Sequence, residues 1–160
     1  MPIYTRQGDT GTTSLYCGVR VDKDAPSIEV CGNIDELSAS LGMIRVDGVQ
    51  PFETLILRIQ QELIAFCADI VSDSATISQG HVQRLESEID RLELELPPLT
   101  QFVMAGESRT SAALHLSRTI CRRAERSLVT FLRTQQKSPH LTAYLNRLGD
   151  LLFVMARYGE

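Results

Sequence analysis

The sequence contains no tryptophan, and aromatic residues account for only 6% of its 160 positions. Proteins that bind single-stranded nucleic acid usually combine positive charge with exposed aromatic rings on which bases stack. Here 20 acidic residues outnumber 16 basic ones, which gives a formal net charge of -4. The composition therefore argues against nucleic acid as a partner.

Long hydrophobic runs are absent as well. No apolar run approaches the roughly 20 residues that cross a bilayer as a helix. The N-terminal sequence MPIYTRQGDTG lacks the charged and then apolar regions of a signal peptide. We therefore expect a cytoplasmic protein with no membrane partner. With 43% hydrophobic residues, positions 1–160 can form a single domain with its own core.

Motifs for metal binding and for nucleophilic catalysis are also missing. No C-x-x-C or G-x-S-x-G motif occurs, and no histidine follows a glutamate by three positions as in di-iron bundles. We expect no metal-ligating residues, and we expect free thiols that mostly fill apolar space. The cysteines are widely spaced, at Cys17, Cys31, Cys67 and Cys121.

What the sequence does have is a helical hydrophobic period from residue 27 onward, with apolar residues spaced by three and four. This predicts five helices: about 27–46, Phe52 to Ile70 after Pro51, Val82 to Leu92 with a stop before Pro97, about 109–136, and Pro139 to Met155 with Ser138 as cap. The first 26 residues lack this period and are predicted to form an extended loop with at most short strand-like pieces. The predicted fold is an all-α, five-helix antiparallel bundle with a ferritin-like up-and-down core, spanning residues 27–160.

The predicted helix over 109–136 carries an unusual excess of arginine for an acidic protein. Arg118, Arg122 and Glu125 follow each other at i, i+4 and i+7, which places them on one helix face, and Arg126 flanks them. One carboxylate cannot neutralise these guanidinium groups, and a guanidinium binds phosphate or carboxylate through two hydrogen bonds. The face indicates an anionic ligand; the alternative is a solvated face with internal Arg–Glu pairs.

Two further segments carry polar groups suited to a nucleotide. In the N-terminal YTRQGDTGTTSLYCG, the glycines Gly8 and Gly11 allow the backbone to present N–H groups to phosphate, although the Walker A pattern is absent and a flexible turn fits equally. In the last predicted helix, Asn146 offers both a donor and an acceptor to a base or a ribose, and simple bundle packing is the alternative.

Asp35 lies one position off the apolar stripe of the first predicted helix. If this carboxylate is partly buried, it needs a partner, and the arginines of the helix over 109–136 can supply one. Solvent exposure fits the spacing equally well.

Together these segments resemble the PduO-type ATP:cob(I)alamin adenosyltransferases over nearly the whole chain. The motifs that carry the resemblance are IYTRQGDTGTTSLYCGVRVDKD, GNIDELSASLG, SRTICRRAER and YLNRLGDLLFVMAR, in this order. The resemblance implies transfer of the 5′-deoxyadenosyl group of ATP to cob(I)alamin, with release of triphosphate and with Mg2+ accompanying the ATP. It also implies homotrimers in which the N-terminal loop of one chain meets the helices of its neighbour.

The resemblance assigns roles to individual residues. A triphosphate-binding loop would comprise Thr5, Arg6, Gln7, Gly8, Thr13, Ser14 and Lys23. The nucleotide site would be completed by Arg122, Arg123, Glu125, Arg126 and Asn146. Asp35 and Arg118 would form a structurally and catalytically important ion pair between the first and fourth helices. Phe102 matches an aromatic residue that helps to displace the lower axial ligand of the corrinoid.

The chain also departs from the family pattern. VMAGES follows Phe102 where a leucine, a proline and two glycines are usual, Gly149 replaces a usual serine, and the sequence stops at Glu160 without the extension that some members fold over the corrinoid. We therefore expect corrinoid handling to differ more than nucleotide binding.

Two other functions remain open from the residues alone. A phosphotransferase on the same bundle would release ADP, and a non-catalytic module that senses or delivers ATP or a corrinoid would bind both without forming product. An adenosyltransferase would release triphosphate and could pass its product to a cobalamin-dependent enzyme.

Overall fold

The computed structural model describes residues 3–48 and 51–158. Within these ranges the chain forms five helices: α1 (Pro26–Val46), α2 (Glu53–Val71), α3 (Gln79–Glu93), α4 (Arg109–Leu132) and α5 (His140–Tyr158). Two short strands precede them, β1 (Thr12–Ser14) and β2 (Arg20–Asp22). The predicted five-helix bundle is confirmed, and the strands are short pieces within the N-terminal segment that is predicted to be an extended loop. No helix among the described residues is long and apolar enough to cross a membrane.

The helix ends follow local chemistry. Pro26 occupies the first turn of α1, where its fixed φ suits the helix and its missing N–H is not needed. The Ser108 hydroxyl accepts a hydrogen bond from the Ser111 N–H at the start of α4, and Ser138 does the same for His140 at the start of α5. α4 ends at Leu132, before the predicted position 136, because no apolar residue after it can hold the chain against the core.

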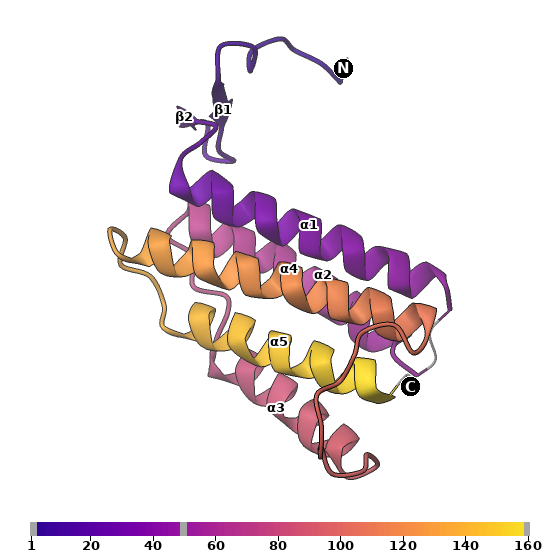
Figure 1. Ribbon diagram of the computed structural model, residues 1–160. Helices are drawn as coiled ribbons and strands as arrows, with labels where there is room; N and C mark the ends of the chain where they lie inside the picture. Colours follow the sequence, from indigo (N-terminus) through magenta and orange to yellow (C-terminus); the bar gives the residue numbers. More distant parts are fainter. Residues whose placement is uncertain (1–2, 49–50, 159–160) are drawn as a thin grey trace.

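The helices pack in a simple order that Figure 1 makes visible. α4 packs against α1 on one side and α5 on the other, α2 packs against α1, and α3 packs against α5. Their apolar stripes form one core, in which Leu37, Phe66 and Tyr144 are fully buried. Burying such side chains stabilises each by about 1.5–3 kcal/mol relative to exposure.

One charged group lies inside this core. Glu62 of α2 is only 8% exposed, and its two carboxylate oxygens accept hydrogen bonds from the Tyr144 hydroxyl at 2.8 Å and from Arg84 at 3.0 Å. Burial, with the neighbouring Glu62 charge, raises the pKa of Tyr144 well above its usual value. The phenol therefore stays protonated and can donate to the carboxylate, and the cluster links α2, α3 and α5.

A second carboxylate organises the connection between α2 and α3. Asp69, 1% exposed, accepts hydrogen bonds from the Ser74 hydroxyl at 2.7 Å and from the backbone N–H groups of Thr76 and Ile77 at 2.9 and 2.8 Å. Burial alone raises the pKa of Asp69, but these donors outweigh it and hold the pKa below its usual value.

β1 and β2 form an antiparallel hairpin in which Thr13 pairs with Val21 and Ser14 with Arg20. Gly18 closes its turn with a φ of +82°, a conformation that residues with a Cβ rarely adopt. The hairpin projects from the end of the bundle at which α1 begins (Figure 1).

Candidate functional site

Four of the polar residues predicted on α4 and α5 line a common pocket. It encloses about 230 Å3 between the two helices and is lined by Arg118, Arg122, Glu125, Asn146, Gly149, Asp150 and Phe153. Helical spacing explains the grouping, since residues three and four apart share a face. The Asn146 amide donates to Glu125 across the helix pair at 3.2 Å. The pocket thus offers guanidinium groups for phosphate, and carboxylate and amide groups for hydroxyls or amines.

Arg118 is held in this pocket by an aromatic ring. Its guanidinium carbon lies 5.7 Å from the centroid of Phe153, and the His115 ring packs on the same phenylalanine at 5.9 Å. A cation over a ring face is attracted by about 0.5–2 kcal/mol. The Nε of Arg118 is buried and has no hydrogen-bond partner among the described residues. The sequence analysis does not single out Phe153, and the structure adds it to the site.

The expected ion pair between Asp35 and Arg118 does not form within the described part of one chain. Asp35 is exposed, and it is the adjacent Glu36 that faces α4, where it binds Arg123 at 2.5 Å. Successive residues point about 100° apart on a helix, so a shift of one position changes the partner. Arg123 therefore lies on the α1 side of α4, away from the α4–α5 pocket.

Arg122 and Arg126 remain exposed on α4. Arg122 lines the pocket, whereas Arg126 lies one turn further on and its guanidinium donates to the Arg122 carbonyl at 3.2 Å. Both cations are available to a ligand that extends along the helix.

The N-terminal residues form a second pocket of about 230 Å3, lined by Thr5, Gln7, Gly8, Thr12, Thr13, Ser14 and Arg20. Arg20 was not predicted, yet it is the cation at its centre. Its guanidinium donates to the Gln7 carbonyl at 2.7 Å, to the Ser14 hydroxyl at 3.2 Å and to the Thr12 hydroxyl. Arg20 pairs with Ser14 across the hairpin, a register that the sequence does not reveal.

Two predicted cations lie beside this second pocket. The Lys23 ammonium lies 3.1 Å from the place where a Cβ on Gly8 would stand, so Gly8 leaves room for it. Arg6 instead turns back over the Tyr4 ring, 5.6 Å from its centroid, and adopts a φ of 61°.

The two pockets have no lining residue in common. The hairpin stands at the beginning of α1, whereas the α4–α5 pocket lies on the side of α4 that faces away from α1 (Figure 1). One chain on its own therefore does not bring the N-terminal loop and the arginine face together.

Phe102 lies apart from both pockets, on the connection between α3 and α4. Its side chain is 99% exposed, and a hollow of about 360 Å3 beside it is lined by residues 97–104, Glu107 and Arg157.

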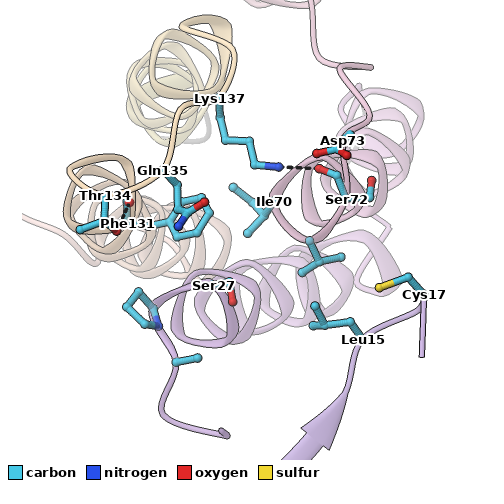
Figure 2. A pocket seen from close by; sticks show the side chains of 13 residues that line it. Leu15, Cys17, Ser27, Ile70, Ser72, Asp73, Phe131, Thr134, Gln135 and Lys137 are labelled. Carbon is cyan, nitrogen blue, oxygen red and sulfur yellow. Dashed lines mark hydrogen bonds between the residues drawn. The ribbon is translucent and has the colours of Figure 1, made fainter. Parts of the chain in front are cut away.

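A larger open cavity of about 560 Å3 contains none of the predicted residues. It lies between the hairpin, the start of α1 and the ends of α2 and α4, with Ile70 and Phe131 in its wall (Figure 2). Its cation, Lys137, already donates to the Ser72 carbonyl at 2.5 Å.

The cysteines of the described chain are free thiols, as predicted, but Cys17 is exposed and fills no apolar space. The Cys31 thiol lies 3.9 Å from the Cys67 carbonyl, and the hydrogen bond between the two side chains lowers the pKa of Cys31. Among the described residues, no group of three or more His, Cys, Asp or Glu side chains is placed to hold a metal ion.

Comparison with known proteins gives a consistent result. A sequence model described as cobalamin adenosyltransferase matches residues 3–159. The corrinoid adenosyltransferase PduO of Salmonella typhimurium is 40% identical over 98% of this chain and 49% of its own length. The corrinoid adenosyltransferase of Bacillus subtilis is 38% identical over 98% of this chain and 86% of its own. The chain thus spans about half the length of PduO but most of the Bacillus protein.

Solved structures agree with the sequence comparison. A variant of the PduO-type ATP:corrinoid adenosyltransferase from Lactobacillus reuteri, complexed with cobalamin and ATP, superposes with a TM-score of 0.90 at 30% identity, over 99% of this chain and 93% of that one. A second variant, complexed with ATP, gives 0.90 at 31% identity, over 98% and 93%. With the match over residues 3–159 and a fold shared at this level, the chain belongs to the cobalamin adenosyltransferase family.

Proposed function

We propose that the chain transfers the 5′-deoxyadenosyl group of ATP to cob(I)alamin, which forms adenosylcobalamin and releases triphosphate. The observation that carries the proposal is the α4–α5 pocket, which joins Arg118 and Arg122 to Glu125 and Asn146 in an otherwise acidic chain. The Lactobacillus reuteri relative is complexed with cobalamin and ATP, which supports the proposal that this chain binds both ligands.

The residues would act by position and charge. Cob(I)alamin is itself a strong nucleophile: its cobalt attacks C5′, the C5′–O bond breaks, and the bonding electrons leave with the triphosphate. The protein then needs no general base. It must hold C5′ in line with cobalt and stabilise the charge that grows on the leaving group, and Arg122, Arg126 and Lys23 would supply this charge.

Mg2+ would accompany the triphosphate. The described residues offer no cluster of acidic ligands for the ion. Phosphate oxygens of ATP would therefore be its main ligands. Thr5, Gln7, Gly8, Thr13 and Ser14 would contribute hydroxyls and backbone N–H groups to the same phosphates.

We propose further that the site forms between chains of a homotrimer. Three features support this: the separation of the two pockets, the exposure of Asp35 without an ion pair to Arg118, and exposed apolar side chains on three helices. The last are Met43, Ile64 and Leu116, which are 68%, 73% and 59% exposed. In the assembly the hairpin of one chain would meet the α4–α5 pocket of its neighbour, and Asp35 would reach a neighbouring Arg118.

A mixing experiment tests the shared site. Lys23→Ala damages the hairpin and Arg122→Ala damages the helix, so each pure variant should be nearly inactive. When the two are unfolded together and refolded, about a quarter of the sites in random trimers would combine an intact hairpin with an intact helix, and activity should return. Mixtures as inactive as the pure variants, although trimers form, would refute a site made by two chains.

Phe102 would act on the corrinoid. Cobalt must be reduced from Co(II) to Co(I), and removing its axial ligand lowers the energy of the orbital that accepts the electron. An apolar wall around Phe102 would favour this by excluding water and the nucleotide tail. The same proposal includes a cytoplasmic location, where ATP is supplied. It also includes delivery of the product to a cobalamin-dependent enzyme.

The proposal is tested by anaerobic incubation with chemically reduced cobalamin and ATP. The corrinoid spectrum should change to that of the cobalt–carbon bond, and triphosphate should appear in equal amount. Release of ADP would identify a phosphotransferase instead, and binding of both ligands without product would identify a delivery or sensor protein.

A further inference from the structure

The connection between α3 and α4 exposes several large apolar side chains. Over residues 94–108 it contains no helix or strand, and Leu94, Phe102 and Met104 are 88%, 99% and 78% exposed. Exposed in this way, these apolar side chains are accessible to a ligand. Because the connection has no regular structure, it can hold these side chains in one orientation only if contacts with the rest of the chain fix its course.

The last turn of α5 provides two anchors for this connection. The Arg157 guanidinium donates to the Pro97 carbonyl at 2.5 Å, and the Tyr158 hydroxyl donates to the Glu95 carboxylate at 2.9 Å. The Tyr158 ring itself packs edge-on against the buried Phe52, with ring centroids 5.5 Å apart. Through this contact, Tyr158 links the connection to the core of the bundle.

The anchor at Pro97 controls more than one residue because Pro98 follows it. Two consecutive prolines fix φ at both positions and restrict the residue before each ring to extended conformations. A hydrogen bond that fixes the Pro97 carbonyl thereby sets the direction of the chain that leaves Pro98. That chain forms the wall of the hollow shared by Phe102 and Arg157.

We infer that Arg157 is a positioning residue for the corrinoid side of the reaction, acting through Pro97 on the segment that carries Phe102, with Tyr158 as a second anchor. This inference rests on the proposed function. Arg157 lines neither the α4–α5 pocket nor the hairpin pocket. Its loss should therefore weaken the use of cobalamin and leave the use of ATP unchanged.

The test compares Arg157→Ala, Arg157→Lys and Tyr158→Phe in the full chain. Arg133→Ala is the matched control, because Arg133 is an exposed arginine at the end of α4 and lines none of the site pockets. For Arg157→Ala we expect the KM for cobalamin to rise on the order of 10-fold or more, since small misplacements of reacting groups are costly, while the KM for ATP stays within about two-fold. Arg157→Lys, which keeps a donor, should recover part of the loss, and Tyr158→Phe should give a smaller effect in the same direction.

Two readouts separate positioning from general damage. The melting temperature of Arg157→Ala should stay near the wild-type value, because the contact that is lost lies on a connection outside the helices. The spectrum of bound cob(II)alamin should shift toward that of the form that keeps its axial ligand.

The inference is overturned if the cobalamin KM and the cob(II)alamin spectrum stay at wild-type values, or if both KM values rise together with a lower melting temperature. A wild-type chain that makes no adenosylcobalamin would instead remove the proposed function. The two failures are thus distinguishable.

Discussion

Asp69→Asn tests the energetic reasoning most directly, because every group involved is buried or hydrogen-bonded. The asparagine oxygen can still accept from Ser74 and Thr76, but its NH2 group would face the Ile77 N–H. Ile77 is 1% exposed, so water cannot replace the lost acceptor. An unsatisfied buried donor costs about 1–3 kcal/mol, and the change from charged to neutral acceptor weakens the two remaining bonds. We expect a total loss of about 2–4 kcal/mol.

Urea unfolding at fixed protein concentration measures this loss. With an m-value of about 2 kcal/mol/M, the midpoint should fall by about 1–2 M. Asp73→Asn is the control, since Asp73 is an exposed carboxylate four positions away and should change the midpoint little. A midpoint for Asp69→Asn that coincides with this control would refute the assignment of Asp69 as the organiser of the α2–α3 connection.

The pH dependence gives an independent check with a defined sign. The pKa of Asp69 is lowered in the folded chain, whereas an unfolded aspartate titrates near 3.9. As the pH falls, the unfolded chain takes up the proton first, so the stabilisation is complete above about pH 4 and is lost as the pH falls through the folded-state pKa. The gap between wild type and Asp69→Asn should therefore be constant at neutral pH and shrink below about pH 4. A gap that grows on acidification would contradict the lowered pKa.

Three further predictions concern the site. Arg122→Ala should lower adenosyl transfer by about 100-fold or more with an unchanged melting temperature, measured in single-turnover kinetics, because an exposed cation that stabilises the leaving group is lost. Near-normal turnover would count against that role. Asp35→Asn should reduce both activity and trimer stability, as seen by light scattering on dilution, since it leaves a neighbouring Arg118 without counter-charge; a fully active and equally stable variant would exclude the pair. Gly149→Ala should stabilise α5 by about 1 kcal/mol, because an added Cβ meets nothing within 4 Å, while it narrows the pocket and raises the KM for ATP. A lower melting temperature would refute the open space beside Gly149.

The sequence was most informative where the chemistry is local. Helical spacing alone grouped Arg118, Arg122 and Glu125, and the structure places them in one pocket because i, i+4 and i+7 share a face in any helix. Ser138 and Pro139 likewise located the start of α5, which begins at His140, whereas Pro51 precedes the Phe52 cap of α2 instead of lying in its first turn. These features depend on a few neighbouring residues and not on the packing of distant ones.

Prediction was incomplete where the answer depended on rotation or register. Sequence spacing did not show that Glu36 is the residue of α1 that pairs with Arg123 on α4, because this depends on the phase of α1 against the core. Arg20 was missed because strands of three residues give no readable alternation, so its pairing with Ser14 was not visible. Phe153 was missed because its contact with Arg118 joins two helices.

The buried Glu62 cluster has a consequence for how the helices align. A one-turn slide of α3 along α5, a shift of about 5.4 Å, would keep most apolar contacts but would carry Arg84 away from its carboxylate. Tyr144 and Arg58, whose Nε lies 3.8 Å from the same carboxylate, would stay beside Glu62, so the slide would remove one of its three partners. Because a buried carboxylate is destabilised when it loses a partner, Glu62 favours the native offset of α3 over a one-turn shift.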